Sequence, residues 1–365
     1  MAAERRNARK KNKKGKMVLL ICEVCVLLVA IVGLLAIWKL TDKKTGIQKY
    51  RIEEPEVNSE VKHRFETDLT LQKYTNIALF GVDARNGVLE KGTRTDTIMI
   101  CSINNETGDI RLTSVYRDTY LNLGNDTYNK CNAAYAKGGY EQAINMLNMN
   151  MDLYITDFVT VGFEGVIKTI DALGGVEIDV QQNEISHLNN YQASMYCTEE
   201  NPNNFTTNYV AVTAPGLQTL SGYQALAYCR IRYTAGSDFR RTERQREVLK
   251  QILEKAKKAS PTTLSNVAKE VMPLVATSLD IEDILAMAGN VTRYNIGETK
   301  GFPFADHITT GKIPGAGDSV IPISLEENVI LLHEYLYPGV EYSPSEDVIN
   351  YSNKIRNDTS PYVGQ

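Results

Sequence analysis

Residues 76–115 read NIALFGVDARNGVLEKGTRTDTIMICSINNETGDIRLTSV, and this stretch decides the fold class. It contains three short runs rich in β-branched and other apolar residues, at 76–82, 97–103 and 110–115. Segments with Gly, Asn, Asp and Thr separate the runs, and apolar runs bounded by turn residues are typical of β-strands. We therefore expect three strands, with a Gly-containing loop between the first two.

Beyond these strands the pattern alternates between helix and strand. Helical periodicity predicts helices at 132–149, 166–173, 220–227, 241–258, 264–276, 281–288 and 325–337. Shorter apolar runs predict strands at 158–161, 176–180 and 228–233. This alternation predicts an α/β fold with a central mixed β-sheet that is covered by helices on both faces.

The composition divides the chain into five segments. We expect a basic tail at 1–16, a transmembrane helix at 17–38, a polar linker or stalk at 39–73, one α/β domain at 74–340 and a polar, disordered tail at 341–365. The apolar run Met17–Trp38 carries one charge, Glu23, and is long enough to cross a bilayer. A signal peptide is the competing interpretation, but it would have a shorter apolar core and a small-residue cleavage site. Basic residues outnumber acidic ones before this run, which predicts a cytoplasmic N-terminus and an external domain.

The charge balance differs between the N-terminal segment and the rest. The first 44 residues hold 11 Lys and Arg and 3 Asp and Glu, which leaves 29 basic and 41 acidic residues in the remainder, a net charge of -12. Proteins that bind nucleic acid carry a basic footprint over a whole face. An acidic domain argues against a nucleic-acid partner, and a local cluster of arginines within it indicates a site.

The cysteines and histidines predict no metal site of their own. Cys131 and Cys197 fall near loops, so a disulfide between them and two free thiols are both open interpretations. Cys101 and Cys229 lie in apolar runs and are expected to be buried free thiols. The four histidines show no motif spacing with an acidic or nucleophilic partner.

Residues 228–246, YCRIRYTAGSDFRRTERQR, hold six arginines. If 228–233 is a strand, Arg230 and Arg232 lie on one face, roughly 7 Å apart. In the following helix, Arg241 and Gln245 continue the apolar stripe formed by Val248, Leu249, Ile252 and Ala256, so both are expected to point inward. Arg240 and Arg246 are expected on a solvated face and Arg244 on the flank. Arg230, Arg232 and Arg241 together suit the binding of a phosphate. Alternatively, they form a buried ion-pair network with Asp and Glu.

Carboxylates and further arginines follow the predicted strands. Asp83 ends the first strand, Arg94 and Asp96 precede the second, and Arg117 and Asp118 follow the third. Ligands usually bind at strand ends in α/β sheets, and paired carboxylates there could share Mg²⁺. The alternative is that these aspartates are turn or cap residues.

Six segments together resemble the LytR-CpsA-Psr family, in the order in which that family carries them. They are NIALFGVDAR, TRTDTIMICSIN, SVYRDTYL, NAAYAKGG, DALGGVEIDV and LSGYQALAYCRIRYTAGSDFRRTERQREVL, which together run from about residue 74 to 258. One departure concerns the DFxR turn, where Arg240 stands in place of a small residue and leaves the register of Arg241 against Arg240 open.

The resemblance implies a phosphotransferase at the external face of a bacterial cell membrane, in an envelope of the Gram-positive type. Its donor would be a glycopolymer on polyprenyl pyrophosphate and its acceptor peptidoglycan. By motif position, the pyrophosphate group maps to Arg94, Arg117, Arg230, Arg232, Arg241 and Gln245, and a Mg²⁺ ion, or Mn²⁺ instead, to Asp83 and Asp96. Arg117, Asp96 and Asp118 are the catalytic candidates, with Asp96 or Asp118 as the base. A polyprenyl-pyrophosphate phosphatase and a non-catalytic receptor for the lipid-linked glycan are the alternatives.

Overall fold

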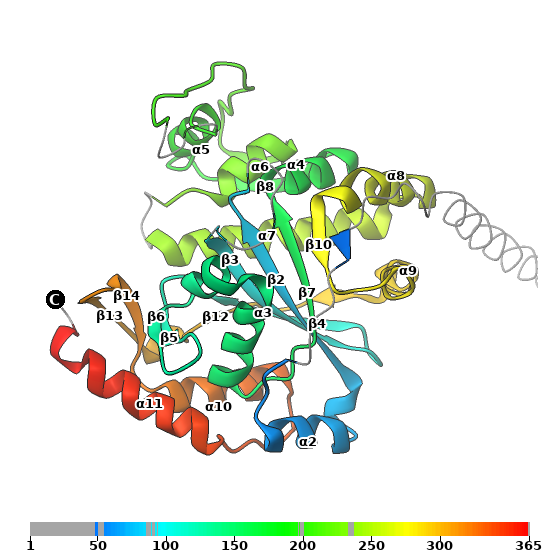
Figure 1. The fold of residues 1–365 in the computed structure, drawn as a ribbon. Helices are drawn as coiled ribbons and strands as arrows, with labels where there is room; N and C mark the ends of the chain where they lie inside the picture. The colour runs from blue at the N-terminus through cyan, green and yellow to red at the C-terminus, as the bar shows by residue number, and fades with distance from the viewer. Residues whose placement is uncertain are drawn as a thin grey trace, which may run out of the picture. The chain divides into compact units, whose positions relative to one another are not determined.

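A computed structural model describes residues 48–49, 55–84, 89, 92, 94–195, 197, 201–232 and 237–363. A mixed sheet of eight strands forms its centre (Figure 1). Seven strands follow one another across the sheet in the order β1, β10, β7, β2, β3, β4 and β11, and β12 also pairs with β4. Their bounds are β1 Gln48–Lys49, β2 Tyr74–Val82, β3 Thr95–Asn104, β4 Asp109–Val115, β7 Asp157–Gly162, β10 Val275–Thr277, β11 Asn295–Ile296 and β12 Lys300–Phe302.

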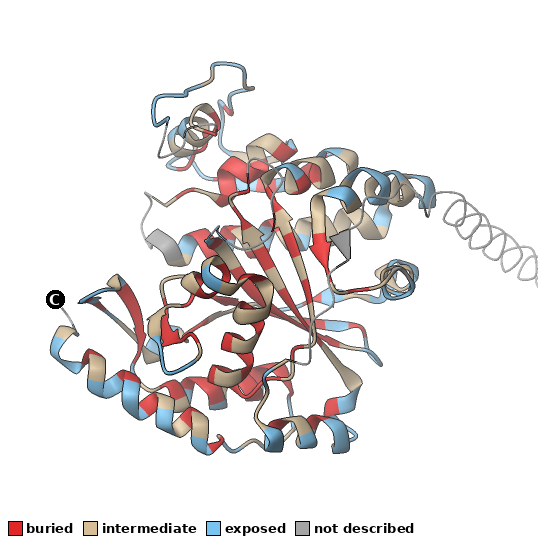
Figure 2. Cartoon of the chain, viewed as in Figure 1, coloured by how far each residue is buried: buried red, intermediate tan, exposed pale blue. Residues whose placement is uncertain are grey.

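Alternate side chains of the central strands face two helical layers, because successive residues of a strand point to opposite sides. Ala78 and Phe80 of β2 pack with helices α2 Ser59–Thr67, α3 Asn132–Met151, α10 Leu325–Leu336 and α11 Glu346–Thr359. Ile77 and Leu79 pack on the other face with α7 Ser237–Lys258 and α9 Ile281–Gly289. Figure 2 shows the buried residues gathered along the central strands and the helix faces against them. The predicted mixed α/β fold, with helices on both faces, is confirmed.

A further apolar cluster lies beside the sheet. It joins α4 Phe163–Ala172, α5 Ile185–Ala193, α6 Gly222–Cys229 and the hairpin of β8 Val176–Val180 and β9 Gly216–Leu220. The remaining elements are the hairpins β5 Tyr120–Asn122 with β6 Tyr128–Lys130 and β13 Ile308–Ile313 with β14 Gly317–Pro322, and the helix α8 Pro261–Val271.

The predicted disordered tail is wrong for residues 346–359, which form α11. Ser345 caps this helix and is held by Asp152, whose carboxylate accepts from the Ser345 N–H and hydroxyl at 2.8 Å each. Val348 and Ile355 lie seven residues apart on one face and are completely buried. A few apolar residues at helical spacing are thus sufficient to dock a segment that is polar overall.

The predicted linker also contains structure. α2 begins after its N-cap Asn58 and buries Val61 and Phe65, one turn apart, in the main core. The predicted span at 17–38 lies outside the described residues. Within the described part of the chain, no helix has the length and apolar character needed to cross a bilayer.

Two other predictions differ from the structure. Residues 228 and 229 complete α6, which begins with the capping box of Ser221 and Gln224, so the strand predicted at 228–233 is wrong for its described residues. Residues 275 and 276, predicted as the end of a helix, belong to β10, which pairs with β7. Of the two open interpretations of Cys131 and Cys197, the disulfide is not formed, and the Cys131 thiol is buried against the carbonyls of Tyr116 and Arg117.

His333 gives the fold a predictable dependence on pH. Its Nε2 lies 2.8 Å from the Met151 carbonyl, its ring stacks on Tyr342, and burial lowers its pKa to about 3. Since the unfolded chain takes up this proton near pH 6.5, the folded state should lose up to about 1.4 kcal/mol of stability per pH unit as the pH falls below 6.5. Urea unfolding between pH 7 and pH 5 measures how steeply the free energy of unfolding changes with pH. This dependence should be weaker in His333→Phe than in the wild type and unchanged in His63→Gln, whose histidine is exposed. An equal dependence in the wild type and both variants would contradict this role.

Candidate active site

A cavity of about 520 Å³ lies where β2, β3 and β7 meet α4, α6 and α7. Seven of the predicted site residues line it: Asp83, Asp96, Arg117, Arg230, Arg232, Arg241 and Gln245. Of the other two, Arg94 is exposed at the start of β3 and does not line the cavity. Asp118 lies behind Arg117 and also stays outside the lining.

A β-bulge places Asp96 in the cavity. Gly81 of β2 pairs with Thr97 of β3, but Val82 pairs with Thr95, so Asp96 is an extra residue on its strand. Bulges re-aim side chains and often lie next to active sites. This one lies in β3 opposite the end of β2, and Asp83 directly follows β2, so the carboxylates of two neighbouring strands line one cavity.

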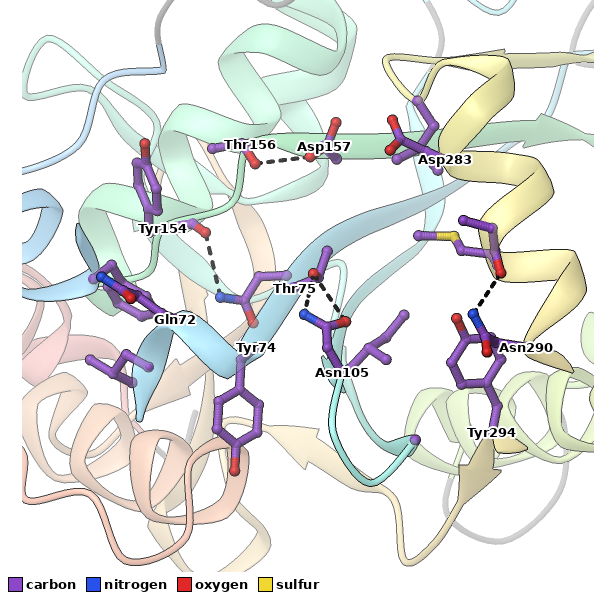
Figure 3. A pocket seen from close by; sticks show the side chains of 18 of the residues that line it. Gln72, Tyr74, Thr75, Asn105, Tyr154, Thr156, Asp157, Asp283, Asn290 and Tyr294 are labelled. Atoms are coloured by element: carbon purple, nitrogen blue, oxygen red, sulfur yellow. Dashed lines mark hydrogen bonds between the residues drawn. The ribbon is translucent and has the colours of Figure 1, made fainter. Parts of the chain in front are cut away.

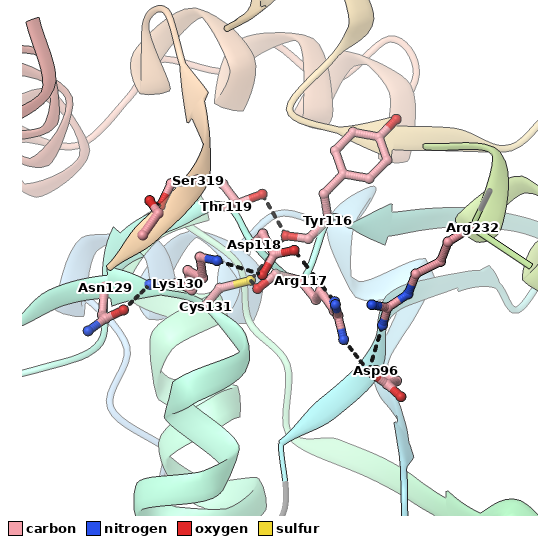
Figure 4. A network of polar contacts seen from close by, with 11 residues as sticks. Asp96, Tyr116, Arg117, Asp118, Thr119, Asn129, Lys130, Cys131, Arg232 and Ser319 are labelled. Atoms are coloured by element: carbon pink, nitrogen blue, oxygen red, sulfur yellow. Dashed lines mark hydrogen bonds and ion pairs between the residues drawn. The ribbon is translucent and has the colours of Figure 1, made fainter. Parts of the chain in front are cut away.

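Asp96 is the centre of a network of charged groups (Figure 4). Its carboxylate pairs with Arg117 Nη1, and Arg232 Nη2 lies 3.8 Å from the same oxygen. The Asp96 backbone carbonyl accepts from Arg241 Nη2 at 3.3 Å. Three arginines from different parts of the chain therefore meet at one aspartate, two at its carboxylate and one at its backbone carbonyl.

Asp118 supports this network from the other side. Its carboxylate lies 3.5 Å from Arg117 Nε and 3.3 Å from Lys130 Nζ. Arg117 thus lies between two aspartates, and its side chain keeps 18% of its surface exposed, on the side of the cavity it lines. The structure places Asp118 where it can orient Arg117.

Arg230 and Arg232 reach the cavity from the turn that follows α6. Arg230 is the C-cap of this helix, and its guanidinium lies over the rings of Phe163 at 5.1 Å and Tyr191 at 5.4 Å. Contacts with aromatic faces hold a cation without consuming its hydrogen-bond donors. The two arginines share the cavity because of this turn and not because of strand alternation.

The helical periodicity of α7 correctly predicted Arg241 and Gln245. Arg241 is 2% exposed, Gln245 lies one turn later, and both line the cavity with Val248, Leu249 and Ile252. Arg240 is exposed and pairs with Glu243 at 2.5 Å, so the open register is settled in favour of Arg241. The prediction that Arg246 lies on a solvated face was wrong, because this residue is only 6% exposed.

The cavity has two chemically different halves. Arginines and carboxylates lie at the ends of β2 and β3, whereas the opposite half is formed by apolar side chains, among them Leu79, Met99, Val159, Leu249 and Ile252. Such a cavity can hold an anionic group at one end and a hydrocarbon chain at the other.

The donor set at the polar end is compatible with a hard cation. Asp83 and Asp96 both line the cavity, and Mg²⁺ is commonly held by one or two carboxylates together with water and substrate phosphate. Among the described residues no group of three or more His, Cys, Asp and Glu side chains could enclose a metal by itself. The two carboxylates therefore fit an ion that is bound jointly with a phosphate.

The sequence did not indicate the buried ion pair behind the arginine turn. Arg244 and Glu184 are each 3% exposed in their side chains, and Arg244 Nη2 lies 2.8 Å from Glu184 Oε1. Arg244 Nη1 also donates to the Ile231 carbonyl at 3.1 Å, between Arg230 and Arg232. Glu184 precedes a helix in a polar segment some 60 residues away, so no local pattern could have linked it to Arg244.

Breaking this pair should destabilise the fold strongly. We expect Glu184→Ala to cost about 3–5 kcal/mol, because it leaves a buried guanidinium without its carboxylate. The double variant Glu184→Leu with Arg244→Met should lose less than the sum of the single variants, because no buried charge remains. Urea unfolding measures both; single variants that each lose under about 1 kcal/mol would contradict this assignment.

A second cavity of about 560 Å³ lies at the other end of the same strands (Figure 3). Tyr74 and Thr75 of β2, Asn105 and Asn290 contribute to its lining, in which amide, hydroxyl and tyrosine side chains are mixed with apolar ones. Its charged side chains are two aspartates and one arginine. This lining does not suit a dianion, and the arginine-lined cavity is the candidate active site.

The chain is similar to one known protein family and to several curated proteins. The model of the LytR_cpsA_psr family matches residues 36–312. Biofilm regulatory protein A of Streptococcus mutans is 27% identical over 261 residues, 68% of this chain and 58% of that protein. The polyisoprenyl-teichoic acid–peptidoglycan teichoic acid transferase TagU of Bacillus subtilis is 30% identical over 57% of this chain and 61% of its own length.

Solved structures share the fold. A transcriptional regulator from Enterococcus faecalis superposes with a TM-score of 0.61 at 24% identity and covers 82% of this chain and 99% of that one. TagT of Bacillus subtilis gives a TM-score of 0.57 at 22% identity, with 79% and 99% covered. Since the family match contains the whole central sheet and every residue of the arginine-lined cavity, the chain belongs to the LytR_cpsA_psr family.

Proposed function

We propose that the protein is a membrane-anchored phosphotransferase that moves a glycopolymer from a polyprenyl-pyrophosphate carrier to peptidoglycan outside the cell. The observation that carries this proposal is the arginine-lined cavity itself, in which a cluster of guanidiniums and carboxylates adjoins an apolar half. A lipid pyrophosphate has the matching two parts. The arginines suit its phosphates, and the apolar side chains suit the first units of its hydrocarbon tail.

The relatives support this assignment by their names. TagU of Bacillus subtilis is named as a transferase of teichoic acid from a polyisoprenyl carrier to peptidoglycan. A family member of similar fold, YwtF (TagT), is described with octaprenyl pyrophosphate bound, at 18% identity and a TM-score of 0.53. Teichoic acid, a capsular polysaccharide or another wall glycan would each fit the proposal, with the lipid bilayer as a partner through residues 17–38.

The proposed reaction is an in-line phosphoryl transfer. An acceptor hydroxyl forms a bond to the phosphorus next to the sugar, and the bond from that phosphorus to the bridging oxygen breaks. Polyprenyl phosphate leaves, and the glycan remains on the acceptor through a phosphodiester. Arg117, Arg232 and Arg241 would neutralise the charge that develops on the transferring and leaving groups.

The three aspartates would have different tasks. Asp83 and Asp96 would hold Mg²⁺ or Mn²⁺, which supplies further charge neutralisation on the phosphates when bound. Asp96 is also the candidate to accept the hydroxyl proton, because it lines the cavity whereas Asp118 does not. Asp118 would act as a positioning residue through its contact with Arg117. The exposed Arg94 could reach a phosphate only by moving toward the cavity.

The test is to incubate the full chain in detergent with a polyprenyl-pyrophosphate-linked saccharide, Mg²⁺ and peptidoglycan fragments. Mass spectrometry should detect a phosphodiester-linked product and polyprenyl phosphate in equal amounts. Polyprenyl phosphate without a coupled product would favour the phosphatase alternative. Tight binding of the donor without turnover would favour the receptor.

A further inference from the structure

A third cavity of about 490 Å³ lies on another side of α7 from the proposed reaction site. Its lining includes Arg240, Arg244, Arg246 and Lys250 of that helix, together with residues 297–299. None of these side chains lines the arginine-lined cavity described above. The two cavities therefore share the N-terminal half of one helix and no lining residue.

Arg246 is a buried cation without a carboxylate partner among the residues that the structure describes. It is 6% exposed, its Nε donates to Thr299 Oγ1 at 2.8 Å, and its Nη1 lies 3.4 Å from Thr242 Oγ1. Its remaining nitrogen, Nη2, makes no hydrogen bond within the described part of the chain and is accessible to solvent. Burial lowers the pKa of Arg246. A buried charge is costly unless an opposite charge compensates it.

Arg244 provides the comparison within the same helix. It is equally buried, but Glu184 neutralises it at 2.8 Å. Two residues later, Arg246 has two hydroxyl groups where Arg244 has a carboxylate. Glu184 therefore neutralises the charge of Arg244, whereas Arg246 has no carboxylate partner among the described residues and lines a cavity.

The surroundings of Arg246 leave the buried part of this cavity positive. Lys250 and Arg240 are exposed at its rim. Three exposed carboxylates, Glu243, Glu247 and Glu298, also line the cavity. Glu243 and Glu298 pair with Arg240 and Lys300, each at 2.5 Å, and Glu247 accepts from the Gln251 amide at 2.9 Å. Exposed pairs of this kind contribute little field because water screens them.

The segment that carries Thr299 is fixed in place. The hydroxyl of Tyr335, on α10, donates to the Glu298 carbonyl at 2.6 Å. Thr299 therefore holds Arg246 from a supported backbone, and the orientation of the guanidinium is set before any ligand binds. Preorganised donors of this kind lose little entropy on binding.

The cavity is also close to the proposed reaction site. Arg246 directly follows Gln245, which lines that site, and its charge partly offsets the rise that burial gives to the pKa of Tyr116, the residue before Arg117. The two cavities therefore lie against different sides of the same part of α7.

We propose that this cavity is a binding subsite for an anionic group of the transferred glycan, a phosphate or a carboxylate, with Arg246 as its main contact and Lys250 at its rim. The proposal rests on the transferase function proposed above and narrows its substrate to a charged glycopolymer. A neutral glycan would give Arg246 no compensating charge.

Binding is measured by calorimetry on the full chain with Arg117→Ala as background, which weakens binding at the reaction site and requires no turnover. The probes are a glycerol phosphate oligomer, an oligogalacturonate and a neutral chito-oligosaccharide of similar length. We expect at least one anionic oligomer to bind, with the affinity falling roughly 10-fold or more in Arg246→Gln and a few-fold in Lys250→Gln. Lys258→Gln, an exposed lysine of α7 outside the cavity, should change nothing.

The comparison of the two anionic oligomers shows which acid the subsite prefers. Equal affinity for the neutral oligosaccharide, or unchanged binding in both Arg246→Gln and Lys250→Gln, would overturn the proposal. Lys250→Gln keeps the test valid if Arg246→Gln fails to fold, because Lys250 is exposed. If the transferase assay yields no product but the anionic oligomer still binds through Arg246 and Lys250, the proposed transfer reaction would be refuted and the proposed subsite would stand.

Discussion

Replacing Arg117 by Ala should lower kcat for glycan transfer by about 10²–10³-fold, the effect of removing one preorganised donor from a developing negative charge. Arg117 is the strongest candidate for such an effect because both of its sides are fixed. Asp96 pairs with Nη1, and Asp118 lies 3.5 Å from Nε. A guanidinium held in this way needs little rearrangement when charge develops on a phosphate.

The change in kcat compared with the change in KM separates a role of Arg117 in the transition state from a role in binding the donor. If Arg117 acts mainly in the transition state, kcat should fall and KM should change little. Arg117→Lys should restore only part of the rate, since an ammonium cannot make two parallel hydrogen bonds to a phosphate. Arg356→Ala, an exposed arginine on α11, serves as the control for charge. A normal kcat with a raised KM in Arg117→Ala would assign this residue to binding alone.

The sequence predicted those parts of the fold that depend on local periodicity. Short apolar runs bounded by turn residues located β2, β3 and β4, and the helical stripe of α7 located Arg241 and Gln245 on the inner face. Each pattern spans only a few residues and reflects the burial of apolar side chains in the core. Arg241 could therefore be placed in the cavity before its surroundings were known.

Other features of the site depend on contacts between distant segments. The bulge at Asp96 is a property of two paired strands, and Arg230 with Arg232 reach the cavity from a helix end that had been predicted as a strand. Arg246 has a polar sequence context typical of an exposed face, but residues 297–299 cover it. Tertiary packing overrode local propensity at each of these positions.

Removing the divalent cation should abolish transfer, and Mg²⁺ or Mn²⁺ should restore it. Asp83→Asn and Asp96→Asn should each reduce the rate roughly 10²-fold or more at a fixed Mg²⁺ concentration, because the amide keeps the size of the side chain and loses the charge that a hard cation needs. Both side chains line the polar end of the cavity at neighbouring strand ends, where a substrate phosphate would complete the coordination.

The two aspartates should differ in a second measurement. Asp96 also pairs with Arg117, so Asp96→Asn should perturb both the metal and the arginine network, whereas Asp83→Asn should mainly raise the cation concentration that gives half-maximal activity. Mn²⁺ binding followed by electron paramagnetic resonance in the presence of a lipid pyrophosphate tests this without turnover, and Asp306→Asn, an exposed aspartate, is the control. If chelation leaves the rate unchanged, charge neutralisation falls to the arginines alone, and Asp96 serves to hold Arg117 and Arg232 in position.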